Sequence, residues 1–521
     1  MERYLLRIVT GICFFTVGIT FSSANADDLI KVYREALRND PIFAQAKSTW
    51  ESQKMNLPIA EAGYLPQVSV TGNASRNYDL SNPPLTSFGP YSWQYGFSLS
   101  LSQPIFNLVV WSQIKGSDAS VKAATATYLE AQQSLMQRTV TGYFSVLQAY
   151  DQLHYTIANR RAVWEQYVVS HEQYKAGIIA ITNEYDARLN YDQVVAQQIA
   201  AQNNLNNQLE NLRALTGHAY TALKELDGHL ILSRPKPSDV NQWVKACAQQ
   251  NYSLKAQNYT VLSAMEAIKQ ADAGADPQLS VQGSDAETHT ADNPFLTAQQ
   301  TQSLGLSLSY KPIQGGLVLA STQQARYNYA TASGLLEQTY RQVVDQARSG
   351  FFNVFSDITR VKADKLSIVA AKDAVDAREA GLKVGTRTMI DLLAAYSSLY
   401  QAQQQLAADQ YTYINNLISL KLAAGTLNLD DLEKINSMLG KSVHFPKQID
   451  VAVMPTDKYD ADITIGDYGD RNEQKKPPEE ETIKNTMPNE VPIIKHEYTP
   501  VCTSLDCKVE PKPGQFWRNF L

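Results

Sequence analysis

The residue types that most often perform catalysis or bind metals are scattered along this chain rather than grouped. The seven histidines stand far apart, at His154, His171, His218, His229, His289, His444 and His496. The sequence contains no H-E-x-x-H pair, no phosphate-binding G-x4-G-K-S/T loop and no G-x-S-x-G nucleophile turn. We therefore expect a protein that is not an enzyme, that binds no cofactor and that does not supply its own energy.

An acidic cluster near the C-terminus suggests calcium binding as another chemistry. Asp460 and Asp462 are followed by Asp467 and Asp470, but the Gly and Glu positions of a calcium-binding loop are missing. We favour a solvated acidic segment over a metal site. The formal charge of −6 and the lack of a long basic stripe also exclude a nucleic-acid partner.

Two predicted helical turns, around Gly177 and Gly385, hold the polar residues with the most specific spacing. Thr388 and Asp391 form an S/T-x-x-D/E pattern, which predicts a capping box at the start of a helix. An acidic side chain is also favoured in the first turn of a helix, where the positive end of the helix dipole lies. On the residues alone, we expect Asp391 to cap a helix.

These turns occupy corresponding positions in an internal duplication. Segment 60–72 returns as 271–283, and Tyr143-Phe-x-Val146 returns as Phe351-Phe-x-Val354, at a spacing of roughly 210 residues. Lys175-Ala-Gly177 pairs with Lys383-Val-Gly385, and segment 212–217 with 420–425. We assign residues 27–235 to a first repeat and 236–436 to a second. Each repeat is expected to run helix, two strands, very long helix, helix.

The predicted strands lie at about 66–78, 95–106, 277–285 and 303–312, where apolar residues alternate with small polar ones. In the second of them Phe97, Leu99 and Leu101 alternate with serines. This period of two predicts transmembrane strands with lipid on one face and water on the other, although a half-buried soluble sheet is the alternative. The linkers 79–94 and 285–303 are expected to be exposed loops.

Four strands do not close a barrel. An open sheet edge in hydrocarbon leaves N–H and C=O groups unpaired, at a cost of several kcal/mol each. If these strands enter a bilayer, several chains must therefore combine their strands.

The predicted helices include two of about 60 residues, at 111–174 and 317–382, which would each reach about 90–100 Å. Shorter helices are expected at 29–62, 182–216, 239–273 and 386–424. In 182–216 apolar residues recur at three- and four-residue steps, a coiled-coil-like pattern whose gaps hold uncharged Gln and Asn. A polar but weakly charged wall suits a water-filled tube.

The two ends of the chain have their own composition. Arg3 and Arg7, the apolar run 8–21 and Ala24-Asn25-Ala26 predict a secretory signal peptide over residues 1–26. Residues 437–521 are expected to form a Pro-rich, disordered tail. Cys247 is expected to be a buried small residue, whereas Cys502 and Cys507 could pair in an exported protein.

In the order of its predicted helices and strands, its duplication and its motifs, the chain resembles the TolC family of outer-membrane channel-tunnel proteins over roughly residues 28–436. The matching motifs are Leu101-Ser-Gln-Pro-Ile-Phe106, Ala176-Gly-x3-Ile181-Thr182, Leu308-Ser-x2-Pro312-Ile-x-Gly315-Gly316, Val384-Gly-Thr-Arg-Thr388 with Asp391, and Ala424-Gly-Thr-Leu427. The resemblance implies a mixed α and β fold and a homotrimer. Four strands from each chain would form a 12-stranded transmembrane β-barrel, continued by an α-helical coiled-coil tunnel across the periplasm.

The resemblance also implies a function: a passive duct in the outer membrane for multidrug efflux, type I protein secretion or both. An inner-membrane ABC or RND transporter and a periplasmic adaptor would dock at its inner end and open it. A non-conducting trimeric coiled-coil surface or scaffold protein is the alternative. The duplication favours the duct, because a stalk needs no internal repeat.

In the family, the two turns close the tunnel entrance. Thr182, Arg387 and Asp391 match the family's entrance residues, with Gly177 and Gly385 as the turn glycines. Three residues depart from the family pattern: Asn183 replaces an acidic residue, Ala394 replaces a second aspartate, and Leu382 replaces a tyrosine that forms a lock. We therefore expect a weaker closure and a less negative entrance.

Overall fold

The computed structural model describes residues 27–78, 91–227, 232–291 and 298–445. These residues belong to one compact unit, 1–452. The predicted signal peptide, the acidic cluster 460–470, His229, His496, Cys502 and Cys507 lie outside the described residues. No helix in the described ranges combines the length and the apolar character that crossing a membrane would require.

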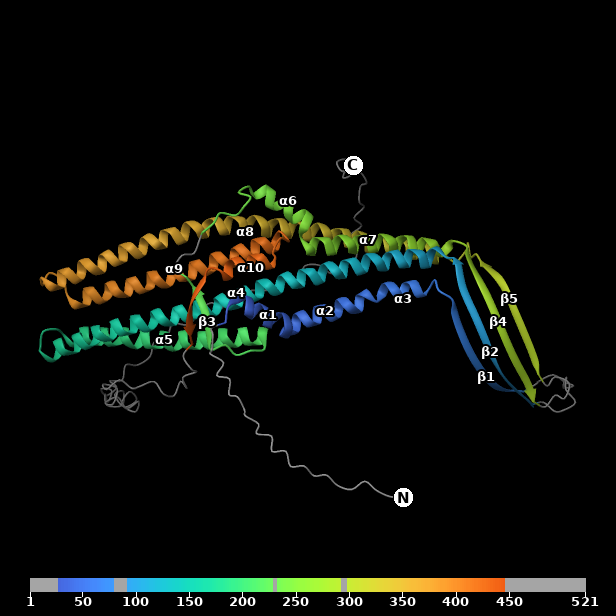
Figure 1. Cartoon of the computed structure of the whole chain (residues 1–521), viewed down its shortest axis with the longest axis horizontal. Helices are drawn as coiled ribbons and strands as arrows, with labels where there is room; N and C mark the ends of the chain where they lie inside the picture. Colours follow the sequence, from blue (N-terminus) through green and yellow to red (C-terminus); the bar gives the residue numbers. More distant parts are fainter. Residues whose placement is uncertain (1–26, 79–90, 228–231, 292–297, 446–521) are drawn as a thin grey trace, which may run out of the picture. The chain divides into compact units, whose positions relative to one another are not determined.

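The long helices and the helices that follow them repeat in the order that the duplication predicts, but the single helices predicted at 29–62 and 239–273 are each divided (Figure 1). The long helices are α4 (Leu108–Lys175) and α8 (Leu317–Lys383), which turn back into α5 (Ile181–Thr216) and α9 (Met389–Ala423). Before the strands, the first half has α1 (Leu29–Asn39), α2 (Pro41–Lys54) and α3 (Asn56–Ala62); the second has α6 (Val240–Gln250), α7 (Tyr252–Asp272) and the short 3-10 turn η1 (Ala273–Ala275). A short helix, α10 (Leu429–Asn436), follows α9.

Corresponding helices begin with the same kind of cap. The Asp40 carboxylate accepts a hydrogen bond from the Phe43 N–H at 2.8 Å, and the Asn251 amide oxygen accepts one from the Leu254 N–H at 2.9 Å. Each side chain satisfies a backbone donor that the first helical turn leaves unpaired. The cap residues Asp40 and Asn251 therefore determine where α2 and α7 begin, in the same way in both repeats.

The main sheet has the antiparallel order β1-β2-β4-β5, formed by β1 (Gln67–Tyr78), β2 (Tyr91–Phe106), β4 (Gln278–Ala291) and β5 (Gln299–Ser309). Its strands reach further than the alternation predicted, since residues 91–94, 286–291 and 299–302 belong to strands rather than to loops. The apolar alternation fades there, but the ladder of backbone hydrogen bonds to a neighbouring strand continues, and pairing does not need an apolar side chain.

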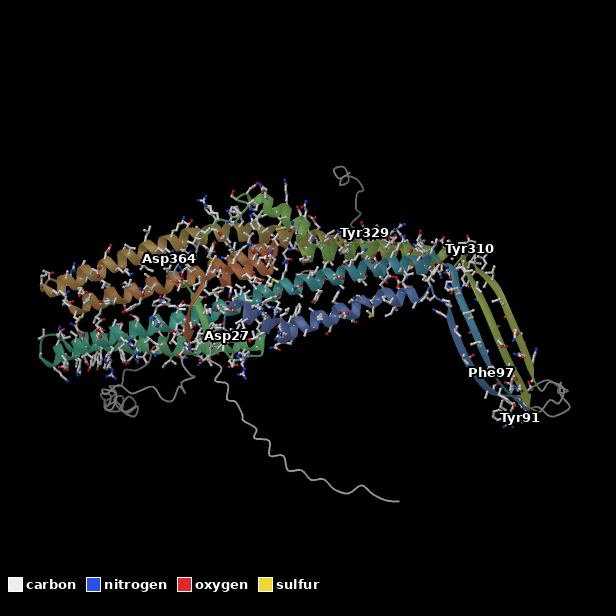
Figure 2. All side chains as sticks on the ribbon, viewed as in Figure 1. Asp27, Tyr91, Phe97, Tyr310, Tyr329 and Asp364 are labelled. Carbon is white, nitrogen blue, oxygen red and sulfur yellow. The ribbon has the colours of Figure 1, made fainter. Side chains whose placement is uncertain are left out.

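The two faces of the sheet differ as predicted near the helices. On one face serine and threonine hydroxyls pair across strands, as in Ser69 with Ser100 at 2.6 Å and Ser284 with Ser303 at 2.7 Å. The other face carries Val70, Leu99 and Leu306. Figure 2 shows Phe97 and Tyr91 further along β2, toward the end of the sheet that lies away from the helices.

The apolar face does not continue along β4. Asp285 lies opposite Leu99, Glu287 lies opposite Phe97, and the His289 ring stacks on Tyr95 at 5.2 Å. The sequence predicts that the strand ends at about residue 285 and that a loop follows, where a charge carries no penalty. Their strand register instead places two acids and a histidine on the same side as the leucines.

A second, two-stranded sheet pairs β3 (Ala222–Leu226) with β6 (Leu439–His444). The prediction that the disordered tail begins at residue 437 is therefore wrong for residues 439–444. Val443 is buried in that sheet. Tyr143 on α4 donates its hydroxyl to the Lys224 carbonyl at 2.6 Å, which joins this small sheet to the helical core.

The main core surrounds α4, which packs against α1, α5 and α9. Its largest fully buried side chains include Tyr143, Phe144, Leu147, Leu205, Leu212, Ile414 and Ile418. Cys247 is also buried in this core, as the sequence predicted.

Candidate functional site

The candidate site is the pair of turns that join α4 to α5 and α8 to α9. Gly177 and Gly385 adopt φ values of 72° and 75°, and a Cβ atom at either position would meet nothing within 4 Å. Glycine is therefore required by the left-handed backbone and not by crowding. The Ile178 N–H donates to the Gln173 carbonyl, and the Thr386 N–H to the Gly381 carbonyl, each at 2.9 Å. These bonds build the same Schellman turn twice.

The start of α9 confirms the predicted capping box. The Thr388 hydroxyl accepts from the Asp391 N–H at 3.2 Å, and the Asp391 Oδ2 accepts from the Thr388 N–H at 3.1 Å and from its hydroxyl at 3.0 Å. The bond from the Thr388 backbone, supported by its hydroxyl and by Arg387 and Arg378, lowers the pKa of Asp391. The equivalent start of α5 has Ala180 as N-cap and no side-chain cap.

The structure does not bring the two groups of predicted site residues together within one chain. Thr182 and Asn183 are exposed at the start of α5. The Arg387 stem lies over Gly381, where an added Cβ would come within 2.7 Å of the Arg387 Cγ. In the ranges that the structure describes, no hydrogen bond or ion pair joins Arg387 to Thr182 or Asn183.

The remaining predicted residues lie along the α8–α9 hairpin. Ala394 is exposed on α9, one turn beyond Asp391. Leu382 packs against an apolar cluster of Val375, Leu392, Ala395 and Leu399, which holds α8 to α9. A leucine at this position is therefore a packing residue of its own hairpin.

Two polar contacts near the turns were missed from the sequence. Glu184, the neighbour of Asn183, is buried, and its carboxylate lies 3.2 Å from the Nδ1 of His171 on α4. Arg378 on α8 donates to the backbone carbonyl of Asp391 at 2.9 Å. Each contact ties the beginning of one helix to the end of its partner. In the sequence, Glu184 and Arg378 look like ordinary surface charges. The feature that could have indicated these contacts is the spacing of each residue from its partner across the turn.

Further from the turns, three acidic residues of α8 and α9 lie near one another: Asp357, Asp364 and Asp409. Arg360 lies 3.4 Å from Asp409, and the Asn416 amide donates to Asp357 at 2.7 Å. Burial, together with the neighbouring Asp409, raises the pKa of Asp364, labelled in Figure 2, to about 6. Among the residues that the structure describes, no group of His, Cys, Asp or Glu is arranged to hold a metal ion. We assign these acids to the packing of the hairpin.

Comparison with known proteins identifies the family. Residues 32–218 and 243–426 match the family described as "Outer membrane efflux protein". The chain is 35% identical over 452 residues to "Outer membrane protein TolC" of Escherichia coli (strain K12), covering 85% of this chain and 90% of that protein. It is 26% identical to "Alkaline protease secretion protein AprF" of Pseudomonas aeruginosa, covering 82% of this chain and 91% of that protein.

Solved structures agree on the fold. The Campylobacter jejuni CmeC outer membrane channel superimposes with a TM-score of 0.66 at 16% identity, covering 84% of this chain and 98% of that one. The match to the family and to its relatives places this protein in the outer membrane, where it is an exit duct for efflux and secretion. The family is not a known enzyme family. The chain belongs to the outer membrane efflux protein family, which confirms the resemblance read from its motifs.

Proposed function

We propose that three copies of the chain form one duct, in which twelve strands close a barrel and the helices continue it as a tunnel through the periplasm. The observation that carries this proposal is the open order β1-β2-β4-β5, which leaves the outer edge of β1 and the outer edge of β5 unpaired among the described residues. Unpaired strand edges are not stable in hydrocarbon. Head-to-tail pairing of β5 with β1 of a further copy would satisfy both edges.

The duct would act in tripartite export, opened when a periplasmic adaptor and an inner-membrane ABC or RND transporter dock at the turns. The chain performs no catalysis in this proposal, and the transporter supplies the energy. Its cargo would be drugs, secreted proteins or both. A relative named for protease secretion supports protein cargo, and the family description of efflux supports small molecules.

The turns would form the entrance gate. Both bonds that the Asp391 carboxylate accepts end on Oδ2, so Oδ1 stays available to face the entrance. The lowered pKa keeps this carboxyl ionised at neutral pH. Asp391 could then cap α9 and also contribute a negative charge to a ring of three. Ala394 adds no second ring, and Arg387 of one copy would bond to Thr182 or Asn183 of the neighbouring coil.

Conductance recordings across a planar lipid bilayer, made with the purified protein, test this function. We expect discrete, cation-selective steps whose size is limited by the closed turns. The alternative is a non-conducting coiled-coil scaffold, and it would insert without any conductance. A protein that inserts stably and stays silent, even when Arg387→Ala loosens the turns, would exclude the duct.

A further inference from the structure

The two repeats differ at one place where the helices meet the main sheet (Figure 1). In the first repeat, Tyr64 and Trp111 pack together between the end of α3 and the start of α4. Their ring centroids lie 6.4 Å apart, and the Tyr64 hydroxyl donates to the Ile105 carbonyl at 2.6 Å. The matching positions of the second repeat hold Ala275 and Leu319. With these smaller side chains, a hollow of about 420 Å³ lies between the end of α7 and the start of α8.

The start of α8 also lacks the cap that α4 has. In α4, the Asn107 side chain accepts a hydrogen bond from the Val110 N–H at 3.2 Å. In α8, Gly316 is the N-cap residue, with a φ of 86° and no side chain to accept a bond. No hydrogen bond from the Val318 or Leu319 N–H is found in the described ranges, and both residues line the hollow. Free N–H groups at the start of a long helix, together with its dipole, attract an anion.

A buried hydroxyl in the same hollow lacks a partner. Thr322 on α8 lines the hollow and is 5% exposed, and its Oγ1 has no hydrogen-bond partner among the described residues. Its counterpart on α4 is Ile114, which needs none. A buried hydroxyl that stays unpaired costs free energy. A ligand atom that bonds to Thr322 would remove this cost, so the hydroxyl indicates a polar occupant.

Two opposite charges border the hollow. Asp272 at the end of α7 and Arg326 on α8 both line it and are exposed, and neither forms an ion pair within the described part of the chain. The counterpart of Arg326 in the first repeat is Asp118, which pairs with Lys122 at 2.8 Å. A guanidinium can bond a phosphate through two N–H groups, and a carboxylate can pair with an amine. The charges therefore match a zwitterion that carries a phosphate and an amine.

The hollow lies at the edge of the proposed membrane sheet. Figure 2 shows Tyr310 where the sheet meets the helices, and aromatic residues flank the lipid-facing band of a barrel at both interfaces. Ile313, three residues further, is 91% exposed, and Leu319 is 78% exposed. The hollow is therefore at the level of lipid headgroups on the helix side, with apolar side chains beside it that acyl chains can cover.

We propose that this hollow binds the headgroup of a zwitterionic phospholipid from the membrane leaflet on the helix side. The phosphate bonds to the free N–H groups of α8, to Thr322 and to Arg326, and the amine pairs with Asp272. This inference rests on the barrel of the proposed duct, because it needs strands that lie in lipid, and it adds one lipid site to each copy. The first repeat offers no such site, since Tyr64 and Trp111 occupy the space.

Native mass spectrometry of the purified full-length protein in detergent tests the site. The probes are phosphatidylethanolamine, which carries a phosphate and an amine, and phosphatidylglycerol, which carries only the phosphate, with identical acyl chains. We expect one phosphatidylethanolamine per copy at low lipid concentration. Phosphatidylglycerol should bind about 2- to 5-fold more weakly, since an exposed ion pair contributes little. Asp272→Asn should abolish this preference; a preference that survives in Asp272→Asn would exclude the contact with the amine.

The phosphate contacts and the source of the headgroup have their own tests. Arg326→Gln should weaken the binding of both lipids about tenfold, as expected for a hydrogen bond to a charged group. Arg341→Gln is the matched control, because Arg341 is an exposed arginine of the same helix about 22 Å further from the sheet. O-phosphoethanolamine and inorganic phosphate, which lack acyl chains, should compete poorly. Displacement of the lipid by an equal concentration of inorganic phosphate would show a simple anion site and overturn the lipid proposal.

Filling the hollow gives the decisive variant. Ala275→Tyr combined with Leu319→Trp copies the aromatic pair of the first repeat and should abolish binding of phosphatidylethanolamine. Circular dichroism checks that this variant folds. Equal lipid binding by the folded double variant and the parent would overturn the site.

Thr322 separates lipid binding from a structural role. Thr322→Val removes the unpaired hydroxyl, so it should raise the thermal unfolding midpoint in lipid-free detergent. It should also reduce the further rise in midpoint that phosphatidylethanolamine produces. An unchanged lipid-induced rise would exclude the contact with Thr322.

Bilayer recordings separate this site from the proposed function. A parent protein that conducts but binds no phosphatidylethanolamine in detergent would overturn the lipid site and leave the duct standing. A parent that binds the lipid at this site but never conducts would refute the duct and support the site.

Discussion

A lysine placed on either face of β5 tests whether this sheet enters lipid. Leu306 lies near the middle of the apolar stretch from Leu304 to Tyr310, opposite Val281 on β4, and it is 70% exposed. Ser307 is the next residue, and it points to the other face, where it lies opposite Ser280. The two substitutions differ by one residue along the strand and therefore by only about 3.4 Å in position.

The expected cost follows from depth in the membrane. A lysine facing lipid costs about 2–4 kcal/mol at the midplane and about 0–1 kcal/mol near the interface. Leu306 is central to the apolar stretch, so Leu306→Lys should lower the free energy of unfolding by about 2–4 kcal/mol, roughly a 30- to 700-fold change in the folding equilibrium. Leu308 lies closer to Tyr310, and Leu308→Lys should therefore cost less.

The assay is denaturant unfolding of protein folded into lipid vesicles, combined with the fraction of heat-resistant assembly recovered from the outer membrane. Ser307→Lys should unfold near the parent's midpoint, because a lysine on the water-filled side stays hydrated. If Leu306→Lys and Ser307→Lys unfold at the same denaturant concentration, the apolar face does not meet lipid, and the sheet is not a membrane sheet.

Further predictions concern the turns and one buried acid. Asp391→Ala should reduce cation selectivity in bilayer recordings. Block by multivalent cations should be modest already in the parent, because Ala394 supplies no second ring of charge. If the selectivity is unchanged in Asp391→Ala, the role of Asp391 is only to cap α9. Asn183→Asp should lower single-channel conductance, because it gives Arg387 of the neighbouring coil a charged partner and a charge-assisted bond is about twice as strong as a neutral one. Arg387→Ala should raise the conductance. If Asn183→Asp conducts as well as the parent or better, the weak closure is refuted. Burial raises the pKa of Asp151, which accepts a 2.6 Å bond from the Tyr411 hydroxyl, from 3.8 to about 6. The folded state then holds this proton more tightly than the unfolded state, so its contribution to stability falls as pH rises from 3.8 to about 6. Asp151→Asn should remove that fall in denaturant midpoints measured across this range, and a parent and variant that differ by a constant amount at every pH would contradict it.

At the turns, some features are determined by residues close together in the sequence, and others by tertiary contacts. The left-handed glycines at 177 and 385 and the capping box of Thr388 and Asp391 depend on residues a few positions apart, so spacing alone predicted the capping box, and the paired glycines marked the turns. Whether Arg387 meets Thr182 depends on how two separate hairpins approach each other, which no local spacing specifies. Within the chain that the structure describes they do not bond, so the proposed contact requires a neighbouring copy.

The acids on β4 illustrate a different limit. Asp285 and Glu287 break the apolar alternation, and a strand prediction based on that alternation ends where they begin. Pairing with β2 carries the strand on to Ala291 and so decides which face these acids share. The length of β4 therefore depends on the neighbouring strand β2, because the backbone of β2 supplies the hydrogen-bond partners.

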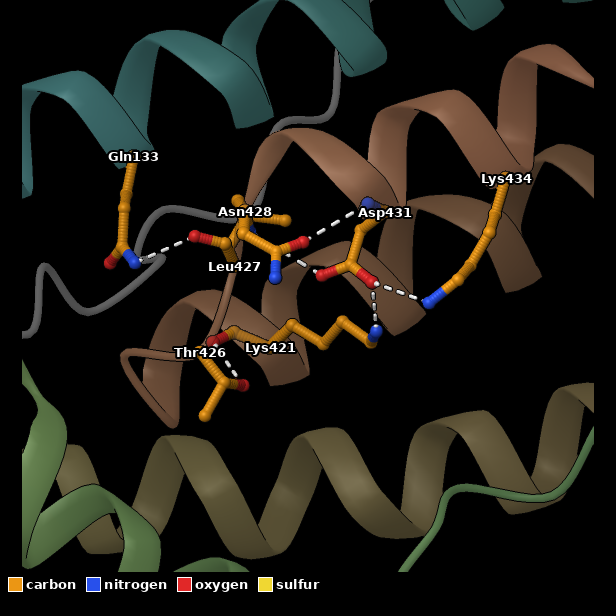
Figure 3. Close-up of polar contacts among 7 residues, drawn as sticks. All are labelled: Gln133, Lys421, Thr426, Leu427, Asn428, Asp431 and Lys434. Carbon is orange, nitrogen blue, oxygen red and sulfur yellow. Dashed lines mark hydrogen bonds and ion pairs between the residues drawn. The ribbon is translucent and has the colours of Figure 1, made fainter.

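The sequence by itself determined the duplication, the two long helices, the period-two strands and the capping box at Asp391, because each rests on a periodicity or on a contact within one turn. Only the tertiary structure decided that β6 leaves the predicted tail to pair with β3, that Gln133 holds the loop after α9 by a hydrogen bond to the Leu427 carbonyl (Figure 3), and that Phe144 is covered while Phe352 is bare. The two phenylalanines occupy equivalent positions in nearly equivalent helices. What distinguishes them is which helix lies alongside, and this depends on the packing of segments that are far apart in the chain.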